Sequence, residues 1–207
     1  MIKITKVEVM NLEGALRGMR NALESWDKSD SYIEYSGYGN SEREFTVGEN
    51  DLKLASTLAN AGSDHGKFLR QIFVSLDITA PLYWWKEFDT YKIGTVANST
   101  STMHRLGSRD LTYDDFSWDF PTVFRNAYLS HINYLIYEWR NDKSEENFRL
   151  MIQDLMDSYN QTRTVTLNYA VLRNQYAARK NHKLQEWREY CEWIKTLHYA
   201  EELIIKI

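Results

Sequence analysis

Reactive side chains are few in this sequence, and most of them suit structural roles. The pattern predicts no metal site, because four of the histidines show no ligand spacing with one another: His104, His131, His182 and His198. The sequence contains neither a glycine-rich phosphate loop nor a G-x-S-x-G nucleophile elbow. Paired carboxylates such as Asp114-Asp115 lie at loop or helix starts, where capping and solvation explain them. The stretch 93–103 is small, polar and rich in Ser, Thr and Asn, and we interpret it as an active-site-like loop.

Two blocks of residues stand out by their order and spacing. The first runs from His65 to Leu106 and combines a histidine near a helix end, a strand, an Ala80-Pro81 step and a polar segment. That polar segment contains, in order, Lys86-Glu87, Thr90-Tyr91-Lys92, Thr95, Ala97-Asn98, Thr100 and Thr102-Met103. The second block begins at Asn168 and continues at offsets of 4, 6, 11 and 17 residues with Leu172, Asn174, Arg179 and Gln185.

In this order the two blocks resemble the flavin-dependent thymidylate synthases. That family has a histidine at a helix end, an Ala-Pro-like step after a strand, and the signature R-Q-x-x-R-H-R-x-x-S-x-N-E-x-S-x-R-Y, on which this chain can be laid without a gap. Members also share the Asn, Leu, Asn, Arg and Gln of the second block at offsets that agree within one residue. The chain is similar to the family over both blocks, although most of its signature residues are replaced.

The resemblance implies an α+β fold, in which a small mixed sheet packs with long helices, over a single domain of residues 1–207. It also implies a homotetramer in which each active site draws on several subunits. Family members transfer a methylene group from a folate to dUMP and reduce it with FADH2. FAD is therefore the implied cofactor, and dUMP, a folate and a reductant are the implied substrates.

The resemblance also assigns roles to particular residues. The implied FAD-binding residues are His65, Lys92, Asn168 and Asn174. The implied nucleotide-binding residues are Thr95, Thr100, Arg105 and Arg179. Arg179 is in addition the implied catalytic residue, because a positive charge beside the carbonyl oxygen of a uracil makes its ring carbon more nucleophilic.

Several signature positions depart from the family pattern. Thr90 and Tyr91 replace an arginine and a histidine, and so remove a charge and an imidazole. Thr102 stands where the family has a phosphate-binding arginine; Arg105, three residues later, is the candidate to replace it. Glu87 would repel an anionic ligand nearby.

Three interpretations follow from this uneven match. The protein is an active synthase that converts dUMP to dTMP, a degenerate relative that keeps the fold with nucleotide or flavin binding or without chemistry, or a structural or partner-binding protein with an unrelated helical fold. Single residues also have simpler explanations: a capping or surface role for His65, a helix N-cap for Asn168, and a solvated charged face for Arg179.

Hydrophobic spacing and turn signals predict the elements that must position these residues. The predicted strands are 2–9, with an irregularity between Ile4 and Val7, and 73–79. The predicted helices are 12–23, one that starts at Asn50 or Asp51 and ends at Gly62, 82–92, 121–140, 144–159 and 167–205, the last broken near Asn181. The predicted loops are 29–49, with a hairpin around Gly37-Tyr38-Gly39-Asn40, and 107–120.

Composition limits the protein class. The chain has 207 residues, 43% of them hydrophobic, so it can bury a sizeable core. Its net charge is −4 with scattered basic residues, which predicts no nucleic-acid partner. The single Cys191 excludes a disulfide framework, and we expect it to be buried. The sequence has no apolar stretch long enough for a membrane span and no signal peptide at the N-terminus, so we expect a cytoplasmic protein.

Overall fold

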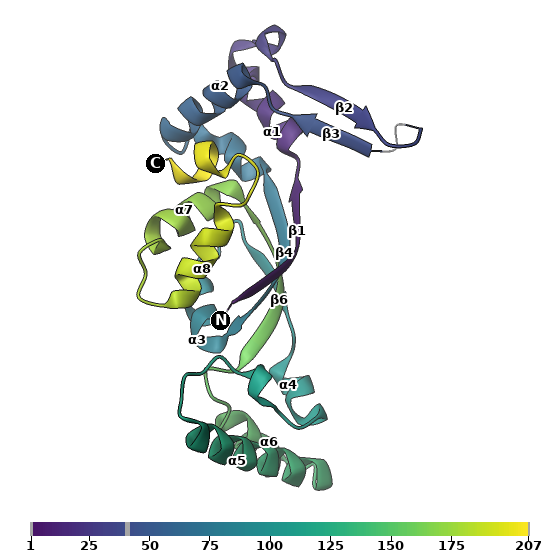
Figure 1. Cartoon of the computed structure of the whole chain (residues 1–207), viewed down its shortest axis with the longest axis vertical. Helices are drawn as coiled ribbons and strands as arrows, with labels where there is room; N and C mark the ends of the chain where they lie inside the picture. The colour runs from purple at the N-terminus through teal and green to yellow at the C-terminus, as the bar shows by residue number, and fades with distance from the viewer. Residues whose placement is uncertain (1, 40–41, 207) are drawn as a thin grey trace. The chain divides into compact units, whose positions relative to one another are not determined.

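A computed structural model describes residues 2–39 and 42–206. Its main sheet has four strands in the order β1-β4-β6-β5 (Figure 1). The strands are β1 (Lys3–Met10), β4 (Phe73–Pro81), β5 (Val96–Ser99) and β6 (Asn160–Asn168). The α+β prediction is confirmed and is refined in one respect, because the sheet is antiparallel rather than mixed. Antiparallel neighbours need no crossover helix between them.

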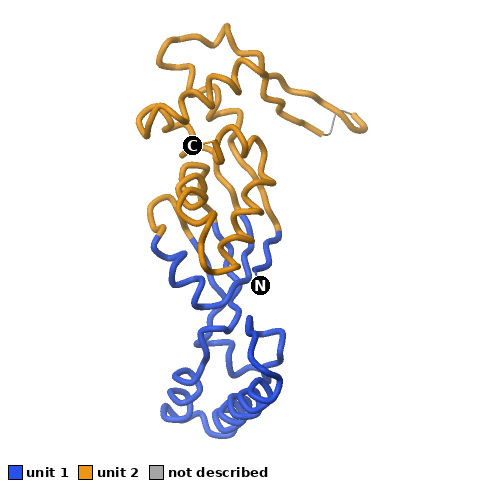
Figure 2. Tube along the Cα trace, turned by 60° about the vertical axis from the view of Figure 1, so that its left-hand side comes forward, with its two compact units in different colours: residues 1–5, 76–90, 97–165 blue, residues 6–75, 91–96, 166–207 orange. Residues whose placement is uncertain are grey.

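The chain divides into two compact units, coloured separately in Figure 2. Unit 1 comprises residues 1–5, 76–90 and 97–165, and unit 2 comprises residues 6–75, 91–96 and 166–207. The division falls inside β4 and inside β6. The single domain expected from the sequence stays a prediction.

Unit 2 holds most of the helices that concern the candidate site. These are α1 (Leu12–Met19), α2 (Glu49–Asn60), a 3₁₀ segment (Gly66–Gln71), α7 (Tyr169–Arg179), α8 (Gln185–Ile194) and a terminal π-helical turn (Glu201–Ile205). Its core includes Leu172, Trp187 and Tyr190, which are all fully buried. A separate hairpin pairs β2 (Tyr32–Ser36) with β3 (Glu42–Thr46) in antiparallel register.

Unit 1 contains α3 (Leu82–Phe88) and three further helices, and it has an apolar cluster of its own. The helices are α4 (Thr102–Arg105), α5 (Thr122–Asn141) and α6 (Glu145–Gln153). Leu106, Ile132, Ile136 and Met151 are buried members of one cluster. Gly107 is needed there, because a Cβ at this position would come within 2.6 Å of the Trp139 ring.

Several local predictions are confirmed. The irregularity in the first strand is real, because Lys6 in β1 has a φ of 52°, which interrupts the alternation of the strand. The predicted hairpin forms as β2 and β3, although Asn40 lies outside the described residues. Ser144 caps α6 by accepting a hydrogen bond from the Asn147 amide. Cys191 is buried, as expected.

Other local predictions are wrong. Neither Asn50 nor Asp51 caps α2: its N-cap is Gly48, and Asp51 is buried in an ion pair instead. The helix after Pro81 ends at Phe88 rather than near residue 92. The expected loop 93–103 contains β5 and the start of α4. The expected helix 144–159 already ends at Gln153, and the expected helix 167–205 begins only at Tyr169, after β6. The break predicted near Asn181 is confirmed, because α7 ends at Arg179 and α8 begins at Gln185.

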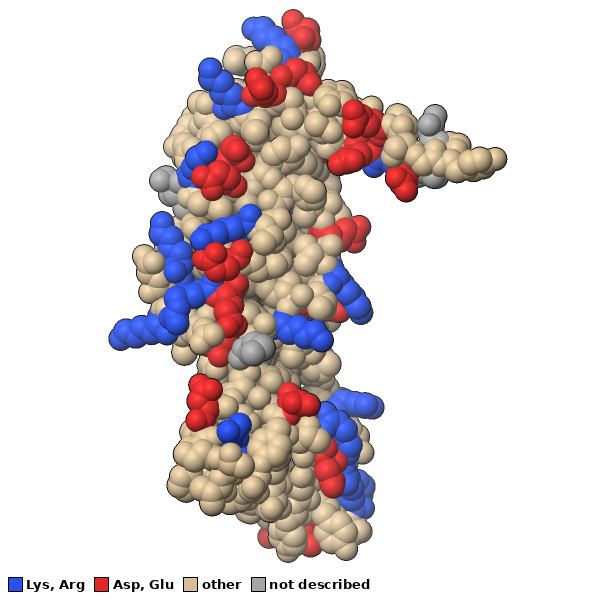
Figure 3. All heavy atoms as spheres, viewed as in Figure 1, with Lys and Arg blue, Asp and Glu red and all other residues tan. Residues whose placement is uncertain are grey.

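Among the residues that the structure describes, every helix is too short or too polar to span a lipid bilayer. Lysine and arginine side chains are interspersed with aspartate and glutamate over the face drawn in Figure 3.

Candidate functional site

A cavity of about 390 Å³ in unit 2 lies where α7 meets the end of α2 and the 3₁₀ segment. It is lined by Asn60, Gly62, Ser63, Arg70, Arg173 and Asn174, together with small apolar residues. The helix register of α7 explains part of this lining. Ala170, Arg173, Asn174 and Ala177 lie at positions i, i+3, i+4 and i+7, so they share one face. The alanines leave space, and the polar side chains line it.

Arg173 gives this cavity its electrostatic character. Its guanidinium donates to the carbonyl oxygens of Leu203 and Lys206 at 3.1 and 3.2 Å, and to Oδ1 of Asn60 at 2.7 Å. All three acceptors are neutral, and burial lowers the pKa of Arg173. Arg70 also contributes a guanidinium, which donates to the Ser63 carbonyl at 3.2 Å. As far as the described residues define the cavity, its lining is neutral or cationic, which favours an anionic ligand.

Two of the predicted FAD-binding residues lie close to this region. Asn174 is exposed and lines the cavity directly. His65 is also exposed, precedes the 3₁₀ segment and lines a second cavity of about 870 Å³. Arg70 lines both cavities. The structure therefore places His65 and Asn174 in two neighbouring cavities of unit 2 rather than in one cavity.

Asn168 has the simpler role that the sequence left open. Its side chain caps α7 by accepting a hydrogen bond from the Val171 amide at 3.1 Å. It is 7% exposed. Its amide nitrogen also faces Gly94, where an added Cβ would come within 2.8 Å of Nδ2. Because Gly94 has a φ of +76°, glycine suits this position for two reasons.

The segment 91–96 joins the first sequence block to the second within unit 2. Tyr91 accepts a hydrogen bond at 3.0 Å from Nε of Arg179, the last residue of α7. Lys92 is exposed. The Thr95 hydroxyl is buried and has no hydrogen-bond partner among the described residues. It can therefore form a hydrogen bond with a ligand or a water molecule. The two blocks therefore meet at the contact between Tyr91 and Arg179, which lie 88 residues apart in the chain.

Thr100 and Arg105 belong to unit 1, whereas the other predicted site residues belong to unit 2. They line a cavity of about 280 Å³ with Arg109, Asp114 and Asp115 among others. The Arg109 guanidinium is held by both carboxylate oxygens of Asp115. Burial by itself would raise the pKa of Asp115, but the Arg109 and Thr112 hydrogen bonds outweigh it and lower that pKa. This cavity therefore has both signs of charge.

Sequence reasoning missed four residues of the candidate site. Arg70 and Arg173 lie within the two blocks but at positions that the family pattern does not assign, and only their helical positions relative to His65 and Asn174 could have indicated them. Tyr91 stands out in the sequence only as a replaced signature position, and the sequence carries no signal for the contact of Tyr91 or Trp187 with Arg179.

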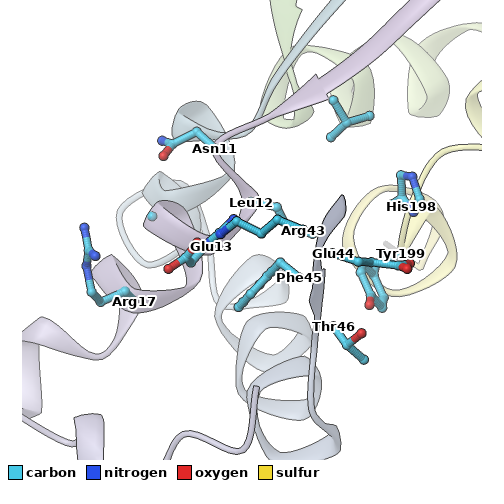
Figure 4. A pocket seen from close by; sticks show the side chains of 12 residues that line it. Asn11, Leu12, Glu13, Arg17, Arg43, Glu44, Phe45, Thr46, His198 and Tyr199 are labelled. Carbon is cyan, nitrogen blue, oxygen red and sulfur yellow. Dashed lines mark hydrogen bonds and ion pairs between the residues drawn. The ribbon is translucent and has the colours of Figure 1, made fainter. Parts of the chain in front are cut away.

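A further cavity of about 630 Å³ contains none of the predicted site residues (Figure 4). It lies between α1, β3 and the segment that follows α8. Arg43 pairs with Glu13 across it, and Glu44 adds a second carboxylate. Two of its lining residues, Asn11 and Tyr199, have positive φ values of 64° and 55°. Its charges are mixed, and its Arg43 is already neutralised, so it favours no single class of ligand.

The residues present fit FAD in part. Arg70 and Arg173 supply positive charge for a diphosphate, and Asn174 supplies an amide at the cavity. The exposed Lys92 is not among the described residues that line it. The unpartnered Thr95 hydroxyl offers a further hydrogen bond in the described structure. Oδ1 of Asn168, by contrast, is engaged in capping α7.

No family model matches the sequence, and no curated protein matches it. Solved structures do match. Thymidylate Synthase X (ThyX) from Helicobacter pylori, in a crystal structure with FAD and dUMP, is 16% identical with a TM-score of 0.74; the match covers 99% of this chain and 97% of that one. A UMP/dUMP methylase, PolB from Streptomyces cacaoi, bound with 5-Br dUMP, is 14% identical with a TM-score of 0.62; the match covers 99% and 95% of the two chains.

Both matches extend over nearly the whole chain. The ThyX match is to the same family that the two sequence blocks resemble. The interpretation as an unrelated helical protein is therefore wrong. The chain has the fold of the flavin-dependent thymidylate synthases.

Proposed function

We propose that this chain is a divergent flavin-dependent thymidylate synthase that binds FAD and converts dUMP to dTMP. The observation that carries the proposal is the neutral-to-cationic cavity of about 390 Å³, which contains Asn174 and adjoins the segment around His65. The fold supports it, because proteins of this fold have been crystallised with FAD and dUMP. A folate and a reductant are the proposed co-substrates.

In this proposal the polar groups of unit 2 hold the cofactor. Arg70 and Arg173 attract the diphosphate, Asn174 hydrogen-bonds to the cofactor, and His65 and Lys92 bind it from the adjoining surface. Asn168 acts indirectly, because it fixes the first turn of α7, on which Arg173, Asn174 and Arg179 are carried. FAD, when bound, supplies the redox chemistry of the reaction.

The nucleotide is assigned to Arg179 and to three residues of the first block. Arg179 places a positive charge beside a carbonyl oxygen of the base, which stabilises negative charge that develops there during the reaction. Thr95 and Thr100 offer hydroxyls, and Arg105 offers a guanidinium for the phosphate. These roles are proposals that rest on the position of each residue in the two blocks.

The cofactor assignment is tested by reconstitution with FAD. The purified protein is incubated with excess FAD and desalted, and the flavin absorbance near about 450 nm is read. We expect a retained band in the wild type and a much weaker band in Arg70→Glu, which reverses one charge of the cavity. Lys53→Glu makes the same charge change on the exposed side of α2 and should retain the band. If both variants retained the flavin band equally, the assignment of FAD to this cavity would be wrong.

The catalytic assignment is tested by release of tritium from dUMP labelled at the reacting ring carbon, in the presence of a folate and a reductant. The second candidate function is a degenerate relative that binds ligand without this reaction. Glu87 in the signature and the carboxylates of Asp114 and Asp115 beside Arg105 favour that candidate, because they oppose a phosphate. Binding of FAD or dUMP without release of tritium would support the degenerate relative.

Two further proposals concern the biological unit. We expect a homotetramer, by analogy with the family the sequence resembles, and a cytoplasmic location.

A further inference from the structure

Arg179 is in contact with two aromatic side chains of unit 2. Its Nε donates to the Tyr91 hydroxyl at 3.0 Å. The guanidinium carbon lies 4.9 Å from the centroid of the Trp187 ring and 5.7 Å from that of the Tyr91 ring. The two rings lie 6.0 Å apart and are inclined by 62°. We call Tyr91 and Trp187 the aromatic clamp.

Each side of the clamp is itself fixed. Trp187 on α8 is fully buried, and its ring packs against Tyr190 at 5.7 Å and against His182 at 6.2 Å. Tyr190 is anchored in turn, because its hydroxyl donates to Oε1 of the buried Gln175 on α7 at 2.9 Å. Tyr91 lies at the start of the segment 91–96, whose Gly94 packs closely on Asn168 and Val171. The clamp is therefore attached to α7, to α8 and to the signature segment.

These contacts restrict the orientation of the Arg179 guanidinium more than a single ion pair would. The hydrogen bond at Nε fixes rotation about the end of the side chain, and the two aromatic rings attract the cation through their faces. An arginine whose orientation is set before the ligand arrives loses less entropy on binding. The arrangement suits a residue that must meet a single acceptor atom, such as a carbonyl oxygen of a pyrimidine base.

We propose that Tyr91 and Trp187 are positioning residues for Arg179, which hold its guanidinium in the orientation that recognises the base of the nucleotide. The proposal rests on the function proposed above. It also gives the replacement of the signature histidine by Tyr91 a purpose, because the new hydroxyl accepts the hydrogen bond from Arg179. Neither clamp residue needs to touch the nucleotide.

The first test uses the ligand-free protein, so it does not depend on the proposed function. The emission of Trp187 is isolated as the difference between the wild type and Trp187→Phe. We expect that difference spectrum to change in Arg179→Met, which removes the cation beside the indole. We expect it to change also in Tyr91→Phe, which removes the hydroxyl that holds the cation in place. Tyr176→Phe removes another hydroxyl from α7 and should leave the spectrum unchanged. An unchanged spectrum in both clamp variants would overturn the clamp.

The second test measures dUMP affinity by calorimetry. We expect Tyr91→Phe to weaken binding about tenfold, Tyr91→His to restore part of the loss because imidazole can accept from Nε, and Tyr176→Phe to bind as the wild type does. A Tyr91→Phe protein that binds dUMP as tightly as the wild type, or more tightly, would overturn the positioning role; tighter binding would mean that Tyr91 occludes Arg179. Failure of the wild type to bind dUMP would instead overturn the nucleotide assignment, while the emission test still decides the clamp.

Discussion

Two ion pairs of equal length show how burial decides the importance of a single residue. Arg20 and Asp51 in unit 2 are joined at 2.6 Å with side chains 5% and 2% exposed, whereas Lys86 and Asp157 in unit 1 are joined at 2.6 Å with side chains 66% and 56% exposed. We expect Asp51→Asn to lower the free energy of unfolding by about 3–5 kcal/mol, because it leaves a buried guanidinium without its counter-ion. We expect Asp157→Asn to lower it by about 0–1 kcal/mol. Urea unfolding of the two variants checks the contrast, and equal losses would contradict it.

The carboxylate of Asp51 also determines how the stability of the protein changes at low pH. Burial by itself would raise the pKa of Asp51, but hydrogen bonds from Ser29, Ser31 and Arg20 outweigh it, so the pKa is lowered. A depressed pKa means that the native state resists protonation, so the stabilisation is present at neutral pH and is lost as the pH falls through the folded pKa. We expect the urea midpoint of the wild type to fall more steeply below about pH 4 than that of Asp51→Asn. Parallel curves for the two proteins would show that Asp51 does not contribute to the acid transition.

Gly94 offers a second prediction at the residue scale. Gly94→Ala combines a φ of +76° with a Cβ only 2.8 Å from Nδ2 of Asn168. Gly39→Ala has a similar φ of +68°, and beyond its chain neighbours no described atom lies within 4 Å of the added Cβ, so it isolates the backbone strain. We expect a loss of about 1 kcal/mol for Gly39→Ala and a clearly larger loss for Gly94→Ala, measured by thermal unfolding. If the losses are equal, the close approach of Asn168 is not a constraint.

At the scale of elements, α7 carries most of the candidate site and depends on its cap. We expect Asn168→Ala to cost about 1 kcal/mol of stability, because the Val171 amide loses its acceptor. Asn168→Asp keeps the acceptor oxygen and should retain most of the stability. If Asn168 also contacted FAD through its amide nitrogen, the Asp variant would still lose flavin absorbance. Full flavin retention by a stable Asn168→Asp protein would leave capping as its only role.

The sequence predicted α7 only approximately, because it missed the strand in front of it. Hydrophobic spacing predicts a helix from Leu167 onward, broken near Asn181, whereas α7 begins at Tyr169 and β6 occupies Asn160–Asn168. In β6 the buried positions Gln161, Val165 and Leu167 share one face, but Gln161 is polar, so the alternation is incomplete. The local signal that could have indicated a strand was the run of β-branched residues at 162 and 164–166. Strand pairing with β4 and β5 is not visible in local spacing.

The candidate site was predictable where it follows the two blocks and not where it depends on tertiary packing. Offsets along the chain identified Asn174 and Arg179, and both lie on α7 in unit 2. They could not reveal that Arg173 and Arg70 line the same cavity, or that Trp187 on α8 packs against Arg179. Those contacts arise from how α2, α7 and α8 pack, for which the sequence offers hydrophobic spacing but no side-chain geometry.

At the scale of the whole molecule, α5 suggests how copies of the chain associate. Only Ile132 and Ile136 of its 20 residues are buried. Val123, Ala127, Tyr134 and Tyr137 are all exposed and recur at helical spacing, so they share one face. A row of exposed apolar and aromatic side chains is typical of an interface. We therefore expect this face to contact another copy in the predicted homotetramer.

Light scattering coupled to size-exclusion chromatography tests that expectation. The wild type should elute with about four times the 24.5 kDa mass of one chain. Tyr134→Glu should reduce the mass to a dimer or a monomer, because it places a charge in an apolar contact. Tyr38→Glu changes another exposed tyrosine, in the β2–β3 hairpin outside this face, and should leave the mass unchanged. A wild-type monomer would contradict the tetramer, and a tetramer that persists in Tyr134→Glu would assign the interface to a surface other than α5.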